Sequence, residues 1–153
     1  EIEGLTTTYF LHLNLKDANG NKIDGNFYWL STKEDVLDFE KSEWHWTPNK
    51  SFGDYTALKD LAKADVAISS NVIEDGQNYV CEVSIDNSSD QIAFFIELNL
   101  ANAETGLSVL PVFWEDNYVS LLPGEKRTML ATVSKTDADN KLPVFTYMGM
   151  NLN

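Results

Sequence analysis

The most informative part of this sequence is the stretch VLPVFWEDNYVSLLPGEKR at positions 109–127. An apolar run ends at Trp114, an acidic and amide-rich turn follows, and a second apolar run stops at Pro123-Gly124. This order of strand, corner, strand and turn is typical of a β-sandwich. The stretch carries no pattern of a nucleophile, a metal cage or a phosphate-binding loop, so it indicates architecture rather than chemistry.

The whole chain beyond Asp65 repeats this rhythm. Short runs with alternating apolar residues are separated by clusters of Asp, Asn, Gly, Ser and Pro, which favour turns. The pattern predicts an all-β fold, an immunoglobulin-like β-sandwich preceded by a β-hairpin and an irregular connector. Because Cys81 is the single cysteine, the internal disulfide of antibody domains is excluded. The predicted strands run over 66–70, 79–86, 92–100, 107–114, 118–121, 127–133 and 144–152.

Alternation within these strands predicts the side chains that face the core. Burial of one large side chain such as Phe94 or Ile96 is expected to contribute about 1.5–3 kcal/mol, and a charge placed there is expected to unfold the domain. Cys81 lies within this pattern and is interpreted as a small buried hydrophobic residue. The predicted inner layer consists of Tyr79, Cys81, Val83, Ile85, Phe94, Ile96, Leu98, Met129, Ala131 and Val133.

The N-terminal part begins with a predicted β-hairpin. Its two strands are expected over 7–15 and 22–30, joined by a turn with an Asn19-Gly20 pair, in which both residues tolerate positive φ. A lone hairpin is marginal in water, so its apolar face is expected to fold back on the sandwich or to pair with a second copy. This face consists of Tyr9, Leu11, Leu13 and Leu15.

Residues 31–61 lack a long periodic element. Positions 32–35 resemble a capping box and predict a short helical turn through Val36 and Phe39. Asp54 is expected to cap a second turn that holds Leu58. Thirty residues without a long element favour a connector that packs along a neighbouring domain.

Composition and charge exclude several classes of function. The chain has 153 residues and a formal charge of −13, with 24 acidic against 11 basic residues. A surface this acidic repels nucleic acids and anionic membranes. No apolar run reaches the roughly 18 residues of a membrane span, and no signal peptide is recognisable. The chain lacks an initiating Met and enters a strand almost at once, which suggests a segment cut from a longer polypeptide.

Two sets of carboxylates are candidates for a catalytic pair that hydrolyses sugars. Asp38 with Glu40 and Glu43 form one set, and Glu115 with Asp116 form the other. A glycosidase pair faces one bond across about 5–10 Å. These residues lie in turns or beside strand ends, where solvated surface is the favoured interpretation.

Metal sites and reactive side chains are weakly supported. The segments 115–117 and 137–140 offer oxygen ligands suited to calcium, but neither has helix-loop-helix calcium spacing, so turn formation is favoured. His12 and His45 lack partners at zinc spacing. No cofactor is expected.

Five aromatic residues are candidates for contact with a ligand or a neighbouring domain. Trp44 and Trp46 are expected on the same side of an extended segment over 42–48. The five rings could form a platform that stacks on sugar rings, or they could be buried against an adjacent domain. The connector position of the two tryptophans favours the second interpretation. The candidates are Tyr28, Trp29, Trp44, Trp46 and Trp114.

The order of several motifs resembles the C-terminal region of family 2 glycoside hydrolases, above all exo-β-D-glucosaminidases and the related β-mannosidases. The resemblance covers nearly the whole chain. In sequence order its motifs are NFYWLS at 26–31, LDF at 37–39, Ser42 with Trp44, Thr47-Pro48, Asp54 with Ala57-Leu58, AFF at 93–95, VLPV at 109–112 with Trp114, DNYVSL at 116–121, PGE at 123–125 and GMNL at 149–152.

The resemblance implies how the chain is organised. Residues 1–30 would be a hairpin remnant of a preceding sandwich domain, 31–62 a connector, and 63–153 the terminal immunoglobulin-like domain. In such enzymes both catalytic glutamates lie in a (β/α)8 barrel. No barrel motif occurs here, so no catalytic residue is carried over.

The resemblance also implies a function. The preferred hypothesis is a non-catalytic accessory module that braces the barrel of a secreted parent enzyme, located in the periplasm or outside the cell. A second hypothesis is a module that binds β-linked glycans through its aromatics, and a third is a free-standing domain whose edge strands recruit a protein. Self-association through the hairpin is a further expectation.

Overall fold

The computed structural model describes residues 2–153 and divides into two compact units, Glu1–Leu61 and Ala62–Asn153. Within the described residues, the only helices are two short 3-10 turns, η1 (Phe39–Lys41) and η2 (Thr56–Asp60), and no helix is long and apolar enough to cross a membrane. The predicted all-β class is therefore confirmed. The assignment of residues 1–30 to a preceding sandwich domain stays a prediction.

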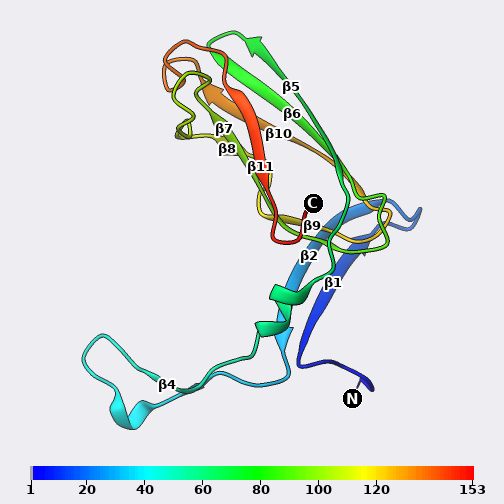
Figure 1. Cartoon of the computed structure of the whole chain (residues 1–153), viewed down its shortest axis with the longest axis vertical. Helices are drawn as coiled ribbons and strands as arrows, with labels where there is room; N and C mark the ends of the chain where they lie inside the picture. Colours follow the sequence, from blue (N-terminus) through cyan, green and yellow to red (C-terminus); the bar gives the residue numbers. More distant parts are fainter. Residues whose placement is uncertain (1) are drawn as a thin grey trace. The chain divides into compact units, whose positions relative to one another are not determined.

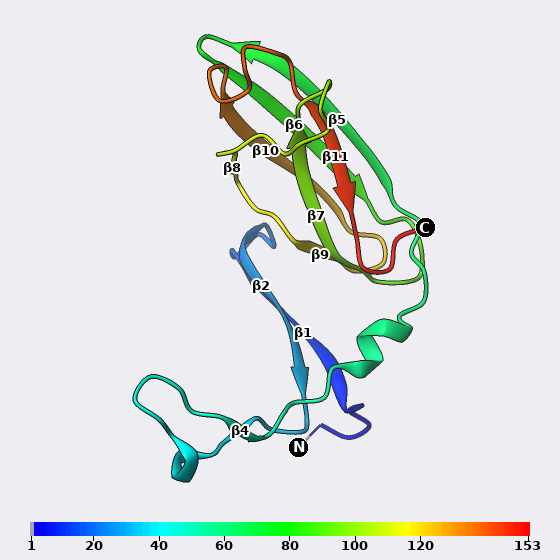
Figure 2. The same ribbon diagram turned by 60° about the vertical axis from the view of Figure 1, so that its left-hand side comes forward.

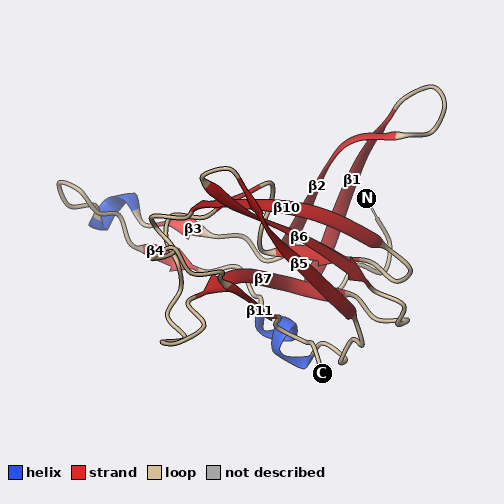
Figure 3. Cartoon of the chain, turned by 90° about the horizontal axis from the view of Figure 1, so that it is seen from above, coloured by secondary structure: helices blue, strands red, loops and turns tan. Residues whose placement is uncertain are grey.

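The second unit is a sandwich of two antiparallel sheets. Figures 1 and 2 show both sheets, and Figure 3 shows β5, β6 and β10 in one layer and β7 with β11 in the other. One sheet has the order β5-β6-β10-β8, and the other has the order β11-β7-β9. The strands are β5 (Ala67–Asp75), β6 (Asn78–Asp86), β7 (Ala93–Ala101), β8 (Phe113–Trp114), β9 (Val119–Leu121), β10 (Lys126–Ser134) and β11 (Val144–Met148).

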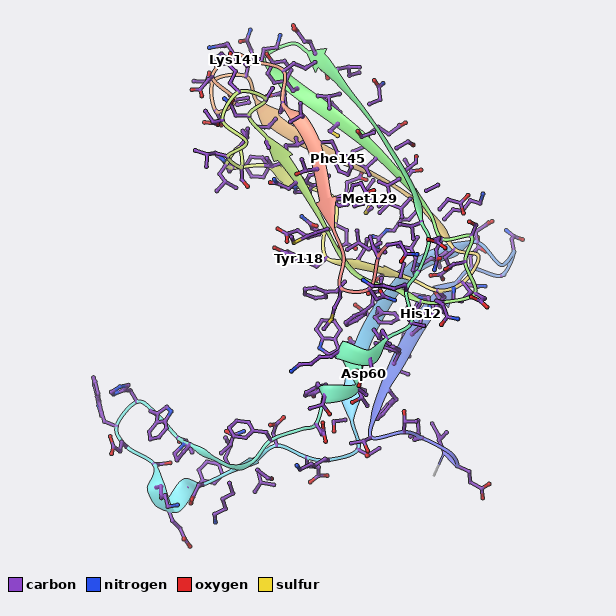
Figure 4. The ribbon with its side chains drawn as sticks, in the orientation of Figure 1. His12, Asp60, Tyr118, Met129, Lys141 and Phe145 are labelled. Atoms are coloured by element: carbon purple, nitrogen blue, oxygen red, sulfur yellow. The ribbon has the colours of Figure 1, made fainter. Side chains whose placement is uncertain are left out.

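The core lies between these two sheets. All ten residues of the predicted inner layer are buried. Nine of them belong to the apolar cluster of the sandwich, which confirms the prediction for these nine, whereas Phe94 is buried outside that cluster. Alternation explains the burial, because every second side chain of β6 and β10 faces the other sheet. Figure 4 shows Met129 among the side chains of the sandwich.

One predicted strand is shorter than expected. The strand over 107–114 is reduced to β8, and Ser108 forms only an isolated bridge to Ala101. Pro111 explains the interruption, since proline has no N–H to donate and its φ is fixed. The backbone N–H of Val109 still donates to the carbonyl of Leu100 at 2.8 Å.

The predicted strand over 144–152 also ends early, at Met148. The chain then bends, and the side chain of Asn151 is buried. Its Oδ1 accepts the N–H of Phe94 at 2.8 Å, and its Nδ2 donates to the carbonyls of Ala62 and Ile92, both at 2.7 Å. One amide thus joins the two ends of the second unit to strand β7.

The first unit contains the predicted hairpin, β1 (Thr8–Lys16) with β2 (Lys22–Ser31). The turn is closed by the carboxylate of Asp17, which accepts the backbone N–H groups of Asn19 at 2.9 Å and of Asn21 at 2.8 Å. The side chain of Asn21 also donates to this carboxylate, and this bond above all lowers the pKa of Asp17.

The predicted apolar face of the hairpin is largely open to solvent. Leu11, Leu13 and Leu15 are exposed. On the opposite face the ring of Phe27 lies 5.4 Å from that of Phe10 and 5.8 Å from that of His12. Aromatic packing within the hairpin therefore favours this second face.

The helical turn predicted through Val36 and Phe39 is wrong at Val36, and a short helical turn, η1, begins only at Phe39. Residues Val36–Leu37 form strand β3, which pairs with β4 (Asn49–Ser51). The carboxylate of Asp35 does not cap a helix, because it accepts the side-chain N–H of Asn49 at 3.3 Å and the backbone N–H of Gly53 at 3.0 Å. This network bridges the chain before β3 to the chain around β4.

The second predicted turn is confirmed as η2, which contains the buried Leu58. The carboxylate of Asp54 accepts the backbone N–H of Thr56 at 3.1 Å and its hydroxyl at 2.7 Å. The hydroxyl of Thr8 donates to the Asp54 carbonyl at 2.7 Å and joins this turn to β1.

Candidate functional site

Two of the five candidate aromatics lie on β2. Tyr28 and Trp29 are consecutive strand residues, so their side chains point to opposite faces of the hairpin. In the register Tyr28 is opposite Leu11, and Trp29 is opposite Phe10. They therefore do not form one flat stacking surface with each other.

The sequence predicted an extended segment that carries Trp44 and Trp46, but the structure shows a turn there. The N–H of Glu43 donates to the carbonyl of Trp46 at 2.8 Å, and the N–H of Trp46 donates back at 3.1 Å. These two bonds close a tight turn with Trp44 and His45 at its tip. Trp44 is 97% exposed, and its ring makes an edge contact with that of His45 at a centroid distance of 5.3 Å.

The fifth candidate, Trp114, belongs to the second unit. It lies on β8 opposite Ala131 of β10 and is half-buried against the core of the sandwich. Its ring thus contributes to packing within its own unit. Contact of these five residues with a sugar stays a prediction.

The first carboxylate set contains one unusual member. Asp38 is buried, and its Oδ2 lies 3.2 Å from the ammonium nitrogen of Lys41. The ammonium nitrogen of Lys50 lies 3.7 Å from Oδ1, which is beyond hydrogen-bonding distance. Glu40 and Glu43 are both exposed. Asp38 is thus a buried acid that pairs with two lysines, whereas the other two acids of the set are solvated. This arrangement favours a structural role for Asp38.

The second carboxylate set is also engaged in structural bonds. Glu115 accepts the backbone N–H of Leu130 at 2.9 Å, and Asp116 pairs with the guanidinium of Arg127 at 2.5 Å. Asn117 binds the backbone of Leu98 twice, accepting its N–H and donating to its carbonyl, both at 2.8 Å. These contacts occupy the oxygens that were considered as calcium ligands.

The second calcium candidate forms a turn. Asp139 and Asn140 have φ values of 54° and 56°, the left-handed conformation that these residue types tolerate. Among residues 2–153 the structure places no group of three or more His, Cys, Asp or Glu side chains that could hold a metal ion.

Cys81 lies fully buried in the core. Burial raises the pKa of its thiol to about 11, so the thiol is protonated at neutral pH. Because the thiolate is the nucleophilic form, the side chain serves as a core residue, as predicted.

The sandwich carries one shallow depression of about 390 Å³ along β5, β6 and β10. Its polar lining includes Ser84, whose hydroxyl lies 3.0 Å from that of Thr128. Asp86, also in the lining, pairs with Lys126 at 2.5 Å. The one carboxylate in this lining is thus held by a lysine, and no second acid faces it there.

An aromatic pair that sequence reasoning missed lies at the bulge between β7 and β9. Phe95 and Tyr118 have φ values of 55° and 53°, which is unusual for bulky residues, and their ring centroids are 5.1 Å apart. The backbone N–H of Phe95 donates to the hydroxyl of Ser120 at 3.1 Å. Figure 4 labels Tyr118. Periodicity could not reveal the bulge, because it interrupts the alternation.

Comparison with known protein families identifies the family to which this chain belongs. Residues 44–152 match the family described as the exo-beta-D-glucosaminidase Ig-fold domain. The chain belongs to this family. The match covers the sandwich and reaches back to Trp44, so the resemblance derived from the sequence motifs is confirmed.

Relatives of this Ig-fold domain are found within much longer proteins. An exo-beta-D-glucosaminidase of Arthroderma benhamiae is 45% identical over 127 residues, which is 83% of this chain and 14% of that protein. One of Amycolatopsis orientalis is 34% identical over 153 residues, covering 98% of this chain and 15% of the relative. The chain thus spans about a seventh of the length of these curated relatives.

Solved structures give the same result for the Ig-fold domain. The crystal structure of the Amycolatopsis orientalis exo-chitosanase CsxA superposes on 99% of this chain with a TM-score of 0.89 and 34% sequence identity. The match covers 18% of the CsxA chain. The protein described here therefore has the fold of a small accessory domain of larger glycoside hydrolases.

Proposed function

We propose that this chain is the non-catalytic accessory module of a longer exo-β-D-glucosaminidase, in which it braces the catalytic barrel. The observation that carries this proposal is that the sandwich closes over its own apolar core, while the carboxylates considered for catalysis are solvated or held in structural bonds. The small share of the matched relatives that the chain covers supports the same assignment.

Two assays test the proposal. The purified 153-residue chain is expected to show no turnover of an aryl β-D-glucosaminide. The full-length enzyme is expected to lose thermal stability when residues 1–153 are deleted, because apolar surface of the barrel would then be exposed. Measurable turnover by the chain alone would contradict the non-catalytic assignment. Equal stability of the truncated and intact enzymes would contradict the bracing role.

A second candidate function is direct binding of β-linked glycans. The nearly complete exposure of Trp44 favours it, because a free indole can stack on the apolar face of a sugar ring. Calorimetry with chitosan and mannan oligosaccharides tests this candidate. Binding at millimolar concentration or tighter that is lost in Trp44→Ala supports it, and no heat with either oligosaccharide opposes it.

Self-association through the hairpin is also a proposal. The exposed Leu11, Leu13 and Leu15 support it, because an apolar strand face seeks a partner. Size-exclusion chromatography with light scattering would show a dimer that Leu13→Asp disrupts. A location of the parent enzyme in the periplasm or outside the cell stays a prediction, which cell fractionation tests.

A further inference from the structure

Residues 36–51, called here the aromatic arm, bury a charged side chain and expose their large apolar side chains. The arm contains β3, η1, the tight turn at Trp44 and β4, and it extends as a loop in Figures 1 and 2. Its most buried side chain is the charged Asp38, at 4% exposure. All of its large apolar side chains are exposed, which reverses the usual arrangement of a folded segment. They are Val36, Leu37, Phe39, Trp44 and Trp46.

The arm is held in shape by polar contacts rather than by an apolar core. Asp38 holds Lys41 at 3.2 Å, and its backbone N–H donates to the carbonyl of Pro48 at 2.7 Å. Toward the tip, the hydroxyls of Ser42 and Thr47 lie 2.7 Å apart. The Asp38–Pro48 and Ser42–Thr47 contacts join the two halves of the arm on either side of the turn. A preformed arm loses less conformational entropy on binding than a flexible loop would.

The exposed side chains of the arm are those that dominate protein interfaces. Trp44 is 97% exposed and Phe39 is 73% exposed. Tryptophan and other aromatic residues are enriched at the centres of interfaces, where they fill apolar pockets. The aliphatic Val36 and Leu37 extend the apolar surface beyond the rings. A sugar-binding platform needs flat rings only, so the aliphatic part favours a protein surface.

One polar atom of the arm is left without a hydrogen-bond partner among the described residues. This atom is Oδ1 of Asp38, which is buried and lies 3.7 Å from the ammonium nitrogen of Lys50. Buried carboxylate oxygens are nearly always hydrogen-bonded, since an unpaired one is costly. The ammonium group of Lys50 is the charge that faces this oxygen.

We infer that the aromatic arm is a docking element that inserts into an apolar recess on the remaining polypeptide of the parent enzyme. The inference rests on the proposed function. Its occupant follows from length, because the matched relatives carry more than four-fifths of their chain outside the matched segment. A second copy of the chain is the alternative occupant, which a concentration series distinguishes.

Hydroxyl-radical footprinting with mass spectrometry tests this inference directly, because it reports the solvent exposure of individual side chains. The oxidation rates of Trp44, Trp46 and Phe39 are compared between the 153-residue chain and the full-length enzyme. We expect at least tenfold slower oxidation of all three residues in the full-length enzyme. Equal rates in the two proteins would overturn the inference.

Other occupants of the arm give distinguishable results. Protection that arises in the 153-residue chain with rising concentration would indicate a second copy and would overturn the inference. Protection of the full-length enzyme that appears only after a glucosamine oligosaccharide is added would indicate a glycan site and would also overturn it.

A pair of matched variants separates docking from folding. Trp44→Ala is expected to lower the melting temperature of the full-length enzyme by several degrees while leaving that of the 153-residue chain unchanged. Phe113→Ala, at a ring of the second unit that is 71% exposed, serves as the control and is expected to change neither. Equal effects of the two substitutions in the full-length enzyme would count against a specific arm.

Failure of this inference differs from failure of the proposed function. If deletion of residues 1–153 leaves the full-length enzyme unaffected, the proposed function fails and the arm has no role to explain. If that deletion destabilises the enzyme while the arm stays fully oxidisable, only the docking arm is wrong.

Discussion

The two units of this chain differ in how far their large apolar side chains are buried. In the second unit the two sheets enclose an apolar cluster that includes Val83, Ile96 and Met129, all nearly inaccessible. In the first unit the hairpin and the aromatic arm leave most of their large apolar side chains exposed. Among the described residues of this unit, the only buried large apolar side chain is Leu58 of η2. Alternation alone therefore does not make a core, because an apolar face also needs a second layer.

The second unit therefore can fold by itself, whereas the first unit needs a neighbouring surface to cover its apolar side chains. The sandwich has the properties of an independent domain, with its own core and buried asparagines that satisfy backbone groups. The first unit consists of elements that resemble one side of an interface. If this comparison is correct, equivalent substitutions in the two units must have unequal effects on stability.

The largest contrast is expected for a charge placed on a strand. Ile96→Asp buries an unpaired carboxylate in the core and is expected to lower the free energy of unfolding by more than about 4 kcal/mol. Leu13→Asp, on the exposed hairpin face, is expected to cost less than about 1 kcal/mol. Urea denaturation followed by circular dichroism measures both. Similar losses in the two variants would break the comparison.

The next largest effect is expected at a buried amide. Asn151→Ala leaves the N–H of Phe94 and the carbonyls of Ala62 and Ile92 without their partner, and is expected to cost about 2–4 kcal/mol. The exposed Asn71 of β5 is the matched control, where alanine is expected to change the unfolding free energy by no more than about 0.5 kcal/mol. A near-neutral Asn151→Ala would mean that this junction does not stabilise the sandwich.

The core thiol predicts a pH dependence that the first unit does not share. Burial raises the pKa of Cys81 from 9.0 to about 11, so the folded state holds this proton more tightly than the unfolded state. Its contribution is complete below pH 9 and is lost as the pH rises toward 11, by up to about 2–3 kcal/mol. The unfolding free energy of Cys81→Ala should therefore fall less over this range than that of the unchanged chain. Parallel curves would refute the assignment.

The smallest contrast concerns two turn glycines with the same backbone requirement. Gly20 in the hairpin turn and Gly124 in the sandwich have φ values of 87° and 78°, and a Cβ at either would meet open space. Alanine at each position thus costs about 1 kcal/mol through backbone strain alone. Only Gly124→Ala is expected to shift the main unfolding transition. Gly20→Ala should instead speed local hydrogen exchange in the hairpin, and a shift of the main transition by Gly20→Ala would argue that the units unfold together.

The sequence was most informative where local pattern and burial agree. The inner faces of β6 and β10 were predicted residue by residue, because strict alternation next to turn clusters leaves one possible core face. The hairpin followed from its Asn19-Gly20 turn for the same reason.

The remaining features depend on contacts that sequence pattern does not encode. The capping-box interpretation at 32–35 failed because Asp35 binds Asn49 and Gly53, which lie far along the chain. The extended segment at Trp44 was wrong because two backbone bonds fold it into a turn. The bulge at Phe95 was missed because the hydroxyl of Ser120, on another segment, takes the place of a backbone acceptor in the ladder.

Hydrogen–deuterium exchange measured on the 153-residue chain and on the full-length enzyme tests the contrast between the two units most directly. We expect amides of β6, β7 and β10 to exchange equally slowly in both proteins, whereas amides of β1, β2 and the aromatic arm become strongly protected only in the full-length enzyme. Equal exchange of the first unit in the two proteins would show that this unit does not depend on a neighbouring domain.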